Sequence, residues 1–118
     1  MMIMNVMLVD DIRILREYLA YEIRKAGYDV MCAESVGEAF DMYRAERPDA
    51  IITDYVLRDG TGLDFSRQIR EGDRKTPICL ISGWDISEAI PWQQYCDKFL
   101  IKQNEISELL RFLEDCRR

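Results

Sequence analysis

Short apolar runs rich in valine and isoleucine alternate along the chain with longer segments in which apolar residues recur every three or four positions. The first pattern is typical of strands and the second of amphipathic helices. The alternation predicts an α/β domain with strands over residues 5–9, 29–33, 50–53, 78–81 and 98–101. The third and fourth runs are almost wholly apolar, which indicates strands near the centre of a parallel sheet that is covered on both faces.

The first helical segment covers residues 12–26 and is followed by Gly27, a residue type that favours helix C-termini. Its predicted inner face consists of apolar residues at helical spacing: Ile12, Leu15, Leu19, Ile23 and Ala26.

Two further helices begin at predicted capping residues. Ser35 with Glu38 forms a capping box, and Thr61 with Asp64 resembles the start of a third helix. The second helix ends before Pro48, because the residue that precedes a proline disfavours the helical conformation. Its predicted buried residues are Ala39, Phe40 and Tyr43.

The sequence predicts a helix less clearly in the fourth helical segment than in the last. Residues 84–97 contain Pro91, which removes a backbone donor and clashes with the preceding turn, so we expect a short, bent or partly irregular element there. The final helix is predicted to begin at an Asn104 cap. Its inward residues would be Ile106, Leu109, Leu110, Leu113 and Cys116.

Composition narrows the class of protein. The 118 residues, 48% of them apolar, suit one compact domain over residues 1–118. A net charge of −6 disfavours nucleic-acid binding, which needs clustered lysine and arginine. The apolar opening run lacks a basic leader and ends at Asp10-Asp11, so we expect a cytoplasmic protein without a membrane span. Four cysteines without a C-x-x-C pair predict reduced thiols.

The absence of histidine excludes imidazole-based triads, histidine-ligated zinc and a phosphohistidine of the chain's own. Polar residues instead follow the predicted strands: Asp10, Asp11, Asp54, Ser82 and Lys102. Ligands of open parallel sheets bind at the carboxyl ends of the strands, and converging carboxylates there favour Mg²⁺. Each residue alone has an equally good structural explanation as a cap, a turn residue or a solvated charge. The joint pattern is more specific.

The chain resembles the receiver domains of response regulators over essentially its whole length. The matching motifs are L-V-D-D at 8–11, I-I-T-D at 51–54, L-R-D-G-T-G at 57–62, I-S-G at 81–83 and F-L-I-K at 99–102. The resemblance implies a flavodoxin-like, doubly wound five-stranded parallel sheet of order 2-1-3-4-5 with flanking helices.

The resemblance also implies a phosphorylation site that binds Mg²⁺. Its members would be Asp54 as phosphoacceptor, Asp11 as a direct metal ligand, Asp10 acting through metal-bound water, and the backbone carbonyl of Val56. Lys102 would pair with the acyl phosphate, Ser82 would hydrogen-bond a phosphoryl oxygen, and Phe99 would change rotamer with it. The donor would be a phosphohistidine on a sensor kinase or phosphotransfer protein, and a downstream protein would bind the face of the fourth and fifth helices.

Departures from the family pattern lead to further expectations. Gln103 stands where most receivers have a proline in a cis peptide, so we expect a trans bond there and a shifted loop. Val56 and Trp84 flank the path of the hydrolytic water and are poorly suited to orient it, so we hypothesise a slowly decaying phosphorylated state. Trp84 and Trp92, with Ile90 and Tyr95, either pack over a shortened helix or form a partner-docking patch.

Three rival classes fit less well. A pseudo-receiver that keeps the fold without phosphorylation is disfavoured because every residue that the chemistry needs is present. A phosphatase of the haloacid dehalogenase type would need an acid–base aspartate where Ile12 stands. A flavodoxin would place Asp10-Asp11 against the flavin phosphate. The sequence leaves open whether the receiver is free-standing or part of a longer regulator or hybrid kinase.

Overall fold

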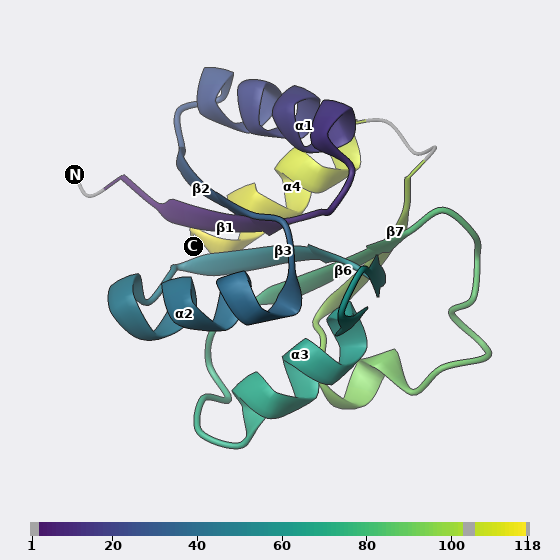
Figure 1. Ribbon diagram of the computed structural model, residues 1–118. Coiled ribbons are helices and arrows are strands. Elements are labelled where there is room, and N and C mark those ends of the chain that lie inside the picture. The colour runs from purple at the N-terminus through teal and green to yellow at the C-terminus, as the bar shows by residue number, and fades with distance from the viewer. Residues whose placement is uncertain (1–2, 103–105, 118) are drawn as a thin grey trace.

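The computed structural model describes residues 3–102 and 106–117 as alternating strands and helices (Figure 1). In chain order the elements are β1 Asn5–Val9, α1 Arg13–Lys25, β2 Asp29–Ala33, α2 Val36–Glu46, β3 Ala50–Asp54, β4 Val56–Leu57, β5 Gly60–Thr61, α3 Gly62–Arg70, β6 Ile78–Ser82, η1 Trp92–Gln94, β7 Lys98–Ile101 and α4 Ile106–Cys116. Each of the predicted long strands is therefore confirmed to within one residue.

The long strands form one parallel sheet in the order β2-β1-β3-β6-β7. Counted along the chain, this is the predicted order 2-1-3-4-5. Every residue of β3 and β6 is buried, as their unbroken apolar sequences predicted. The short strands β4 and β5 pair antiparallel in a separate hairpin between β3 and α3.

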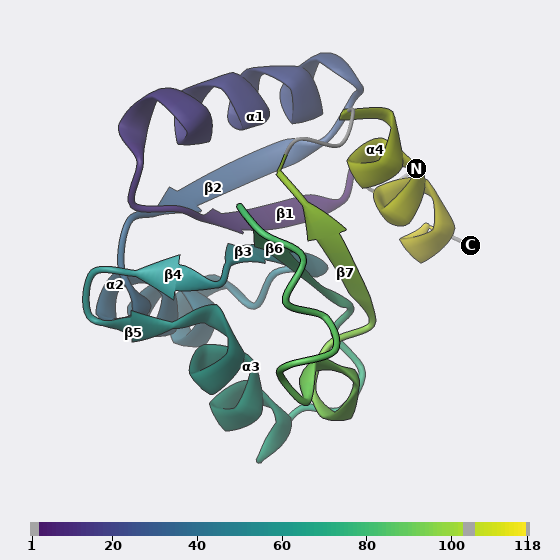
Figure 2. The same cartoon turned by 90° about the vertical axis from the view of Figure 1, so that its right-hand side faces the viewer.

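Helices cover the sheet on both faces (Figures 1 and 2). Alternate residues of β1 point to opposite faces, so Val6 and Leu8 pack with Ile23 of α1 and Leu113 of α4, while Met7 lies in the other core layer. That second layer is covered by α2 and α3. Burial of apolar side chains on both faces supplies the main driving force for folding.

The predicted caps of α2 and α3 are present. The hydroxyl of Ser35 accepts a hydrogen bond from the Glu38 amide at 3.1 Å, and the hydroxyl of Thr61 accepts one from the Asp64 amide at 3.0 Å. Each bond satisfies an amide that the first helical turn leaves without a partner. In α2, Ala39 and Tyr43 are buried as expected, whereas Phe40 is only partly buried against the same core layer.

The predicted inner face of α1 was wrong at both ends. Ile12 is 48% exposed and Ala26 is exposed, because these residues cap the helix and their side chains do not follow its inner face. Ala20, which the prediction omitted, is buried beside Ile23. In α4 the buried residues are Leu109, Phe112 and Leu113, so Phe112 was missed. Ile106, Leu110 and Cys116 pack against that core only in part, and the Asn104 cap lies outside the described residues.

The predicted fourth helix is replaced by an irregular connection. Residues 83–97 are all described, and their only helical turn is the 3₁₀ turn Trp92–Gln94, whose flanking residue is Pro91. The expectation of an irregular element is confirmed. In the described part of the chain, none of the helices combines the length and apolar character that crossing a membrane requires. Cys32, Cys79, Cys96 and Cys116 are free thiols, as predicted.

Candidate functional site

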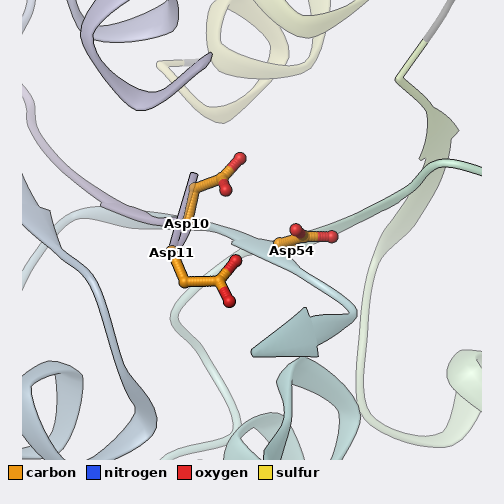
Figure 3. Close-up of side chains that lie close together, drawn as sticks. All are labelled: Asp10, Asp11 and Asp54. Atoms are coloured by element: carbon orange, nitrogen blue, oxygen red, sulfur yellow. The ribbon is translucent and has the colours of Figure 1, made fainter. Parts of the chain in front are cut away.

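Three carboxylates gather at the carboxyl ends of the two central strands β1 and β3 (Figure 3). Asp10 and Asp11 follow β1, and Asp54 is the last residue of β3. One oxygen from each carboxylate lies within 4.8 Å of the others. Asp10 is 0% exposed and Asp54 is 4% exposed, whereas Asp11 is only partly buried. The strand order brings these residues together because β1 and β3 are neighbours.

Asp10 is held through its backbone and through one of its carboxylate oxygens. Its amide donates to the carbonyl of Ala33 at 3.0 Å, and the guanidinium of Arg16 donates to its carbonyl at 2.7 Å. Oδ1 accepts from the amide of Ile12 at 2.9 Å, which fixes the direction of the side chain. Oδ2 is buried and accepts no hydrogen bond from a described residue. An unsatisfied buried carboxylate oxygen is costly unless a ligand pairs with it.

Asp54 is fixed by the close packing of the chain that follows it. The Tyr55 amide donates to the carbonyl of Ile81 at 2.7 Å, and the Gly62 amide donates to the carbonyl of Tyr55 at 2.8 Å. A Cβ atom at position 62 would lie 2.1 Å from the carbonyl oxygen of Asp54. Only glycine allows the start of α3 to approach the end of β3 this closely.

Lys102 is the cation of the cluster. Its Nζ lies 2.7 Å from Oδ2 of Asp54 and 3.5 Å from Oδ2 of Asp10, the first a hydrogen bond and the second an ion pair only. Its amide donates to the carbonyl of Ser82 at 2.7 Å, which ties the end of β7 to the end of β6. Ser82 is almost fully buried at that edge.

The charges in this cluster are not balanced. Burial raises the pKa of Asp54 and of Asp10, although Lys102 opposes the shift at both carboxyls. Burial opposes the charged form of Lys102, yet its bond to Asp54 and the charge of Asp10 raise its pKa. The ammonium group is therefore charged, and one cation faces three carboxylates. A further cation at this position would relieve the excess negative charge.

The donor set fits Mg²⁺. The three side chains present only oxygen atoms, which Mg²⁺ prefers, and Oδ2 of Asp10 has no hydrogen-bond partner among the described residues. Asp11, at the rim, is partly exposed, which leaves room for the water molecules that Mg²⁺ retains. Asp10, Asp11 and Asp54 could thus hold this ion.

Other residues, which sequence reasoning did not identify, fasten the loop after Asp54. The carboxylate of Asp59 accepts from the amides of Val36 and Gly37 at 2.8 and 3.1 Å, and these bonds lower its pKa. Arg58 pairs with Glu34 at 3.3 Å, and Glu34 lies 3.7 Å from Arg16. The hairpin β4–β5 is thereby attached to the start of α2. A carboxylate that caps a helix from a distant turn leaves no local signal in the sequence.

The remaining predicted residues lie in different environments. The Ser82 hydroxyl accepts from the Trp84 amide at 3.2 Å. Val56 and Trp84 are 54% and 72% exposed. Phe99 is partly buried, with its ring centroid 5.9 Å from that of Trp92. Ile90, Trp92 and Tyr95 pack against the core, so the packing interpretation holds for these three residues but not for Trp84. Gln103 lies outside the described residues.

The doubly wound parallel sheet, with a carboxylate cluster and a lysine at the carboxyl ends of its strands, defines a class of phosphoryl-accepting signalling domains. The sequence profile of the "Response regulator receiver domain" matches residues 6–114. The chain therefore belongs to the receiver domain family of two-component response regulators.

Individual relatives agree with this assignment. The chain is 34% identical over 109 residues to response regulator MprA of Mycobacterium avium (strain 104) and 33% identical over 111 residues to MprA of Mycobacterium tuberculosis (strain H37Rv). The alignments cover 91% and 92% of this chain but 48% of each relative. The chain thus spans about half the length of the curated relatives that it matches.

Solved structures share the fold. The response regulator TrrA of Thermotoga maritima, crystallised in complex with Mg²⁺-BeF, superposes with a TM-score of 0.91 at 23% identity, covering 97% of this chain and 99% of that one. The chemotaxis response regulator CheY4 of Vibrio cholerae gives 0.89 at 25% identity, covering 98% and 99%. The predicted flavodoxin-like architecture is confirmed.

Proposed function

We propose that Asp54 is the phosphoacceptor of this receiver domain and that it takes its phosphoryl group from a phosphohistidine on a sensor kinase or phosphotransfer protein. The observation that carries the proposal is the position of its carboxylate. It is buried at the end of the central strand, 2.7 Å from the Lys102 ammonium and among two further carboxylates. The donor histidine has to lie outside these 118 residues, because they contain none.

Mg²⁺ would be held by Asp10, Asp11, Asp54 and the backbone carbonyl of Val56. When bound, the ion supplies positive charge to the phosphoryl oxygens. The fit rests on the all-oxygen donor set and on Oδ2 of Asp10, which is buried without a hydrogen-bond partner among the described residues. The complex of the Thermotoga maritima relative with Mg²⁺-BeF supports the same assignment by similarity of fold.

In the transfer, a carboxylate oxygen of Asp54 attacks phosphorus. A P–O bond forms while the P–N bond to the donor imidazole breaks, and the imidazole nitrogen keeps the electron pair and takes up a proton. Negative charge spreads over the equatorial oxygens during the transfer. Lys102 stabilises that charge because its ammonium group is already held beside the attacking carboxylate. The Ser82 hydroxyl donates a hydrogen bond to a phosphoryl oxygen, and Phe99 changes rotamer together with Ser82.

The protein would catalyse only its own phosphotransfer and autodephosphorylation, with no separate substrate. The lifetime of the acyl phosphate would depend on Val56 and Trp84. Neither side chain is well suited to orient a water molecule for attack on phosphorus, so the phosphorylated state decays slowly. If the purified phosphoprotein loses its phosphoryl group rapidly, and faster than a Trp84→Ala variant, this assignment is wrong.

The switch would operate in the cytoplasm, where kinase and downstream protein both reach it. The downstream protein would bind the face formed by the irregular connection 83–97, β7 and α4. Nucleic acid would not be a partner of this chain by itself, because the net charge is −6.

The proposal is tested by intact-protein mass spectrometry after incubation with acetyl phosphate and Mg²⁺. We expect one phosphoryl addition that requires the metal and is absent from Asp54→Asn. A folded protein that binds Mg²⁺ and gains no phosphoryl group would instead be a pseudo-receiver that acts by protein contacts alone.

A further inference from the structure

A single glutamate, Glu34, joins the two segments of the chain that carry the proposed Mg²⁺ ligands. Its Oε2 lies 3.7 Å from the guanidinium of Arg16, and its Oε1 accepts a hydrogen bond from the guanidinium of Arg58 at 3.3 Å. Arg16 lies in α1, which follows β1, whereas Arg58 lies in the turn between β4 and β5, which follows β3. One carboxylate therefore contacts an arginine from each segment, and we call Arg16, Glu34 and Arg58 the bridge.

The Arg16 end of the bridge acts on the backbone of Asp10. The Arg16 guanidinium donates a hydrogen bond to the Asp10 carbonyl at 2.7 Å, and its side chain is only 15% exposed. The Asp10 amide donates to the carbonyl of Ala33, the residue next to Glu34, at 3.0 Å. The end of β1 is thus joined to the end of β2 twice, once through the backbone and once through Arg16 and Glu34.

The Arg58 end of the bridge acts on the β4–β5 hairpin. Arg58 is two residues from Val56, so a contact that holds its side chain also restrains the Val56 carbonyl. The neighbouring Asp59 accepts hydrogen bonds from the amides of Val36 and Gly37 at 2.8 and 3.1 Å. Arg58 and Asp59 therefore attach the same turn at two points to the junction between β2 and α2.

We propose that Glu34 and Arg58 are positioning residues for Mg²⁺: through the bridge they keep the Val56 carbonyl in place relative to the carboxylates that follow β1. The inference rests on the proposed Mg²⁺ site, whose ligands come from both segments. Mg²⁺ demands nearly ideal octahedral geometry, so its affinity depends on how well ligands from separate segments are held in place. In this role Glu34 and Arg58 act through other residues and do not contact the ion.

The sign of one substitution separates this positioning role from the effect of charge alone. Arg58→Gln removes a positive charge from the segment that leads out of the cation site, so charge alone would raise the Mg²⁺ affinity or leave it unchanged. Loss of the bridge would lower the affinity instead. Glu34→Gln does not separate the two effects, because removal of a carboxylate weakens cation binding in either case.

Isothermal titration calorimetry with MgCl₂ at low ionic strength measures the affinity without any phosphorylation. We expect Arg58→Gln to bind Mg²⁺ about threefold more weakly than the unmodified protein, an effect within the range of a partly exposed ion pair. Arg58→Lys keeps the charge and should recover part of the loss. Because the Arg58 side chain is 60% exposed, we expect the urea midpoint of both variants to stay unchanged, which verifies that they are folded.

Two further variants serve as controls. In a Glu34→Gln background the bridge is already broken, so Arg58→Gln should cause no additional weakening of Mg²⁺ binding. Arg13→Gln removes an exposed arginine that pairs with Glu17 at 2.9 Å and takes no part in the bridge. This matched variant, which changes the net charge by the same amount, should not lower the Mg²⁺ affinity.

The outcomes distinguish the bridge from the proposed function. Equal or tighter Mg²⁺ binding by Arg58→Gln overturns the positioning role and leaves the proposed function standing, and so does an equal weakening by Arg13→Gln. Further weakening by Arg58→Gln in the Glu34→Gln background overturns the part played by Glu34. Weaker Mg²⁺ binding by Arg58→Gln in a protein that acetyl phosphate does not phosphorylate supports the bridge and overturns the proposed function. An unmodified protein that binds no Mg²⁺ overturns both.

Discussion

The two ends of the sheet hold their carboxylates differently. At the amino end, Asp73 accepts hydrogen bonds from the hydroxyls of Tyr43 and Thr76 and from two backbone amides. At the carboxyl end, Oδ2 of Asp10 accepts no hydrogen bond from a described residue. Burial opposes ionisation at both sites. At Asp73 the hydrogen bonds prevail and lower the pKa, while at Asp10 and Asp54 burial prevails and raises it. An aspartate thus stabilises the amino end of the sheet through its hydrogen bonds, whereas the aspartates at the carboxyl end are suited to binding a cation.

We expect the largest difference in the free energy of unfolding when a glycine at each end of the sheet is replaced by alanine. Gly62→Ala would place a Cβ atom 2.1 Å from the Asp54 carbonyl oxygen, so α3 has to move away from β3. We expect the free energy of unfolding to fall by about 3 kcal/mol, measured by urea denaturation. Gly72→Ala, beside Asp73, is the matched control because a Cβ there meets no atom within 4 Å. Equal losses for both variants would contradict the close approach described at Asp54.

Replacing the aspartates at the two ends by asparagine should change the free energy of unfolding in opposite directions. Asp73→Asn removes a charged acceptor of several hydrogen bonds and should destabilise the protein by about 1 kcal/mol at pH 7. Asp10→Asn removes excess negative charge and should stabilise the metal-free protein by about 1 kcal/mol. Urea denaturation in EDTA measures both. Destabilisation by Asp10→Asn would show that the cluster is already balanced without a metal.

Low pH should reduce the contribution of Asp73 to the free energy of unfolding. Its pKa is lower in the folded protein than the ordinary value of 3.8, so its stabilisation is fully present above that pH and is lost as the pH falls below it. The difference in unfolding free energy between the unmodified protein and Asp73→Asn should therefore stay constant from pH 7 to about 4 and shrink as the pH is lowered further. A difference that stays constant there too would mean that the Asp73 hydrogen bonds do not depend on its charge.

The smallest effect is expected at the surface of α1. Arg13 and Glu17 form an ion pair at 2.9 Å, but both side chains are mostly exposed, and such pairs are weakened by solvent and salt. We expect Glu17→Gln to leave the urea midpoint unchanged within error. A clear shift of the urea midpoint would show that this exposed ion pair contributes measurably to the stability of the protein.

The strands and the site residues could be predicted because each depends on local sequence. Apolar runs such as 50–53 and 78–81 are unbroken, and a polar residue ends each strand that leads into the site. Pro91 likewise revealed the irregular connection. What escaped prediction depends on distant partners: the cap that Asp59 provides for α2 and the packing of Trp92 on Phe99. Ile12 was placed inside the helix because spacing alone does not reveal that a residue is its N-cap.

The proposed function requires the phosphoryl group to reside on Asp54. Acyl phosphates are reduced by borohydride, which converts a phosphoaspartate into homoserine and leaves unmodified carboxylates intact. Peptide mapping of the protein after acetyl phosphate, Mg²⁺ and borohydride therefore locates the acceptor. We expect homoserine at position 54 and aspartate at positions 10 and 11. Homoserine at either of those positions, or at none with the protein folded, would contradict the proposed function.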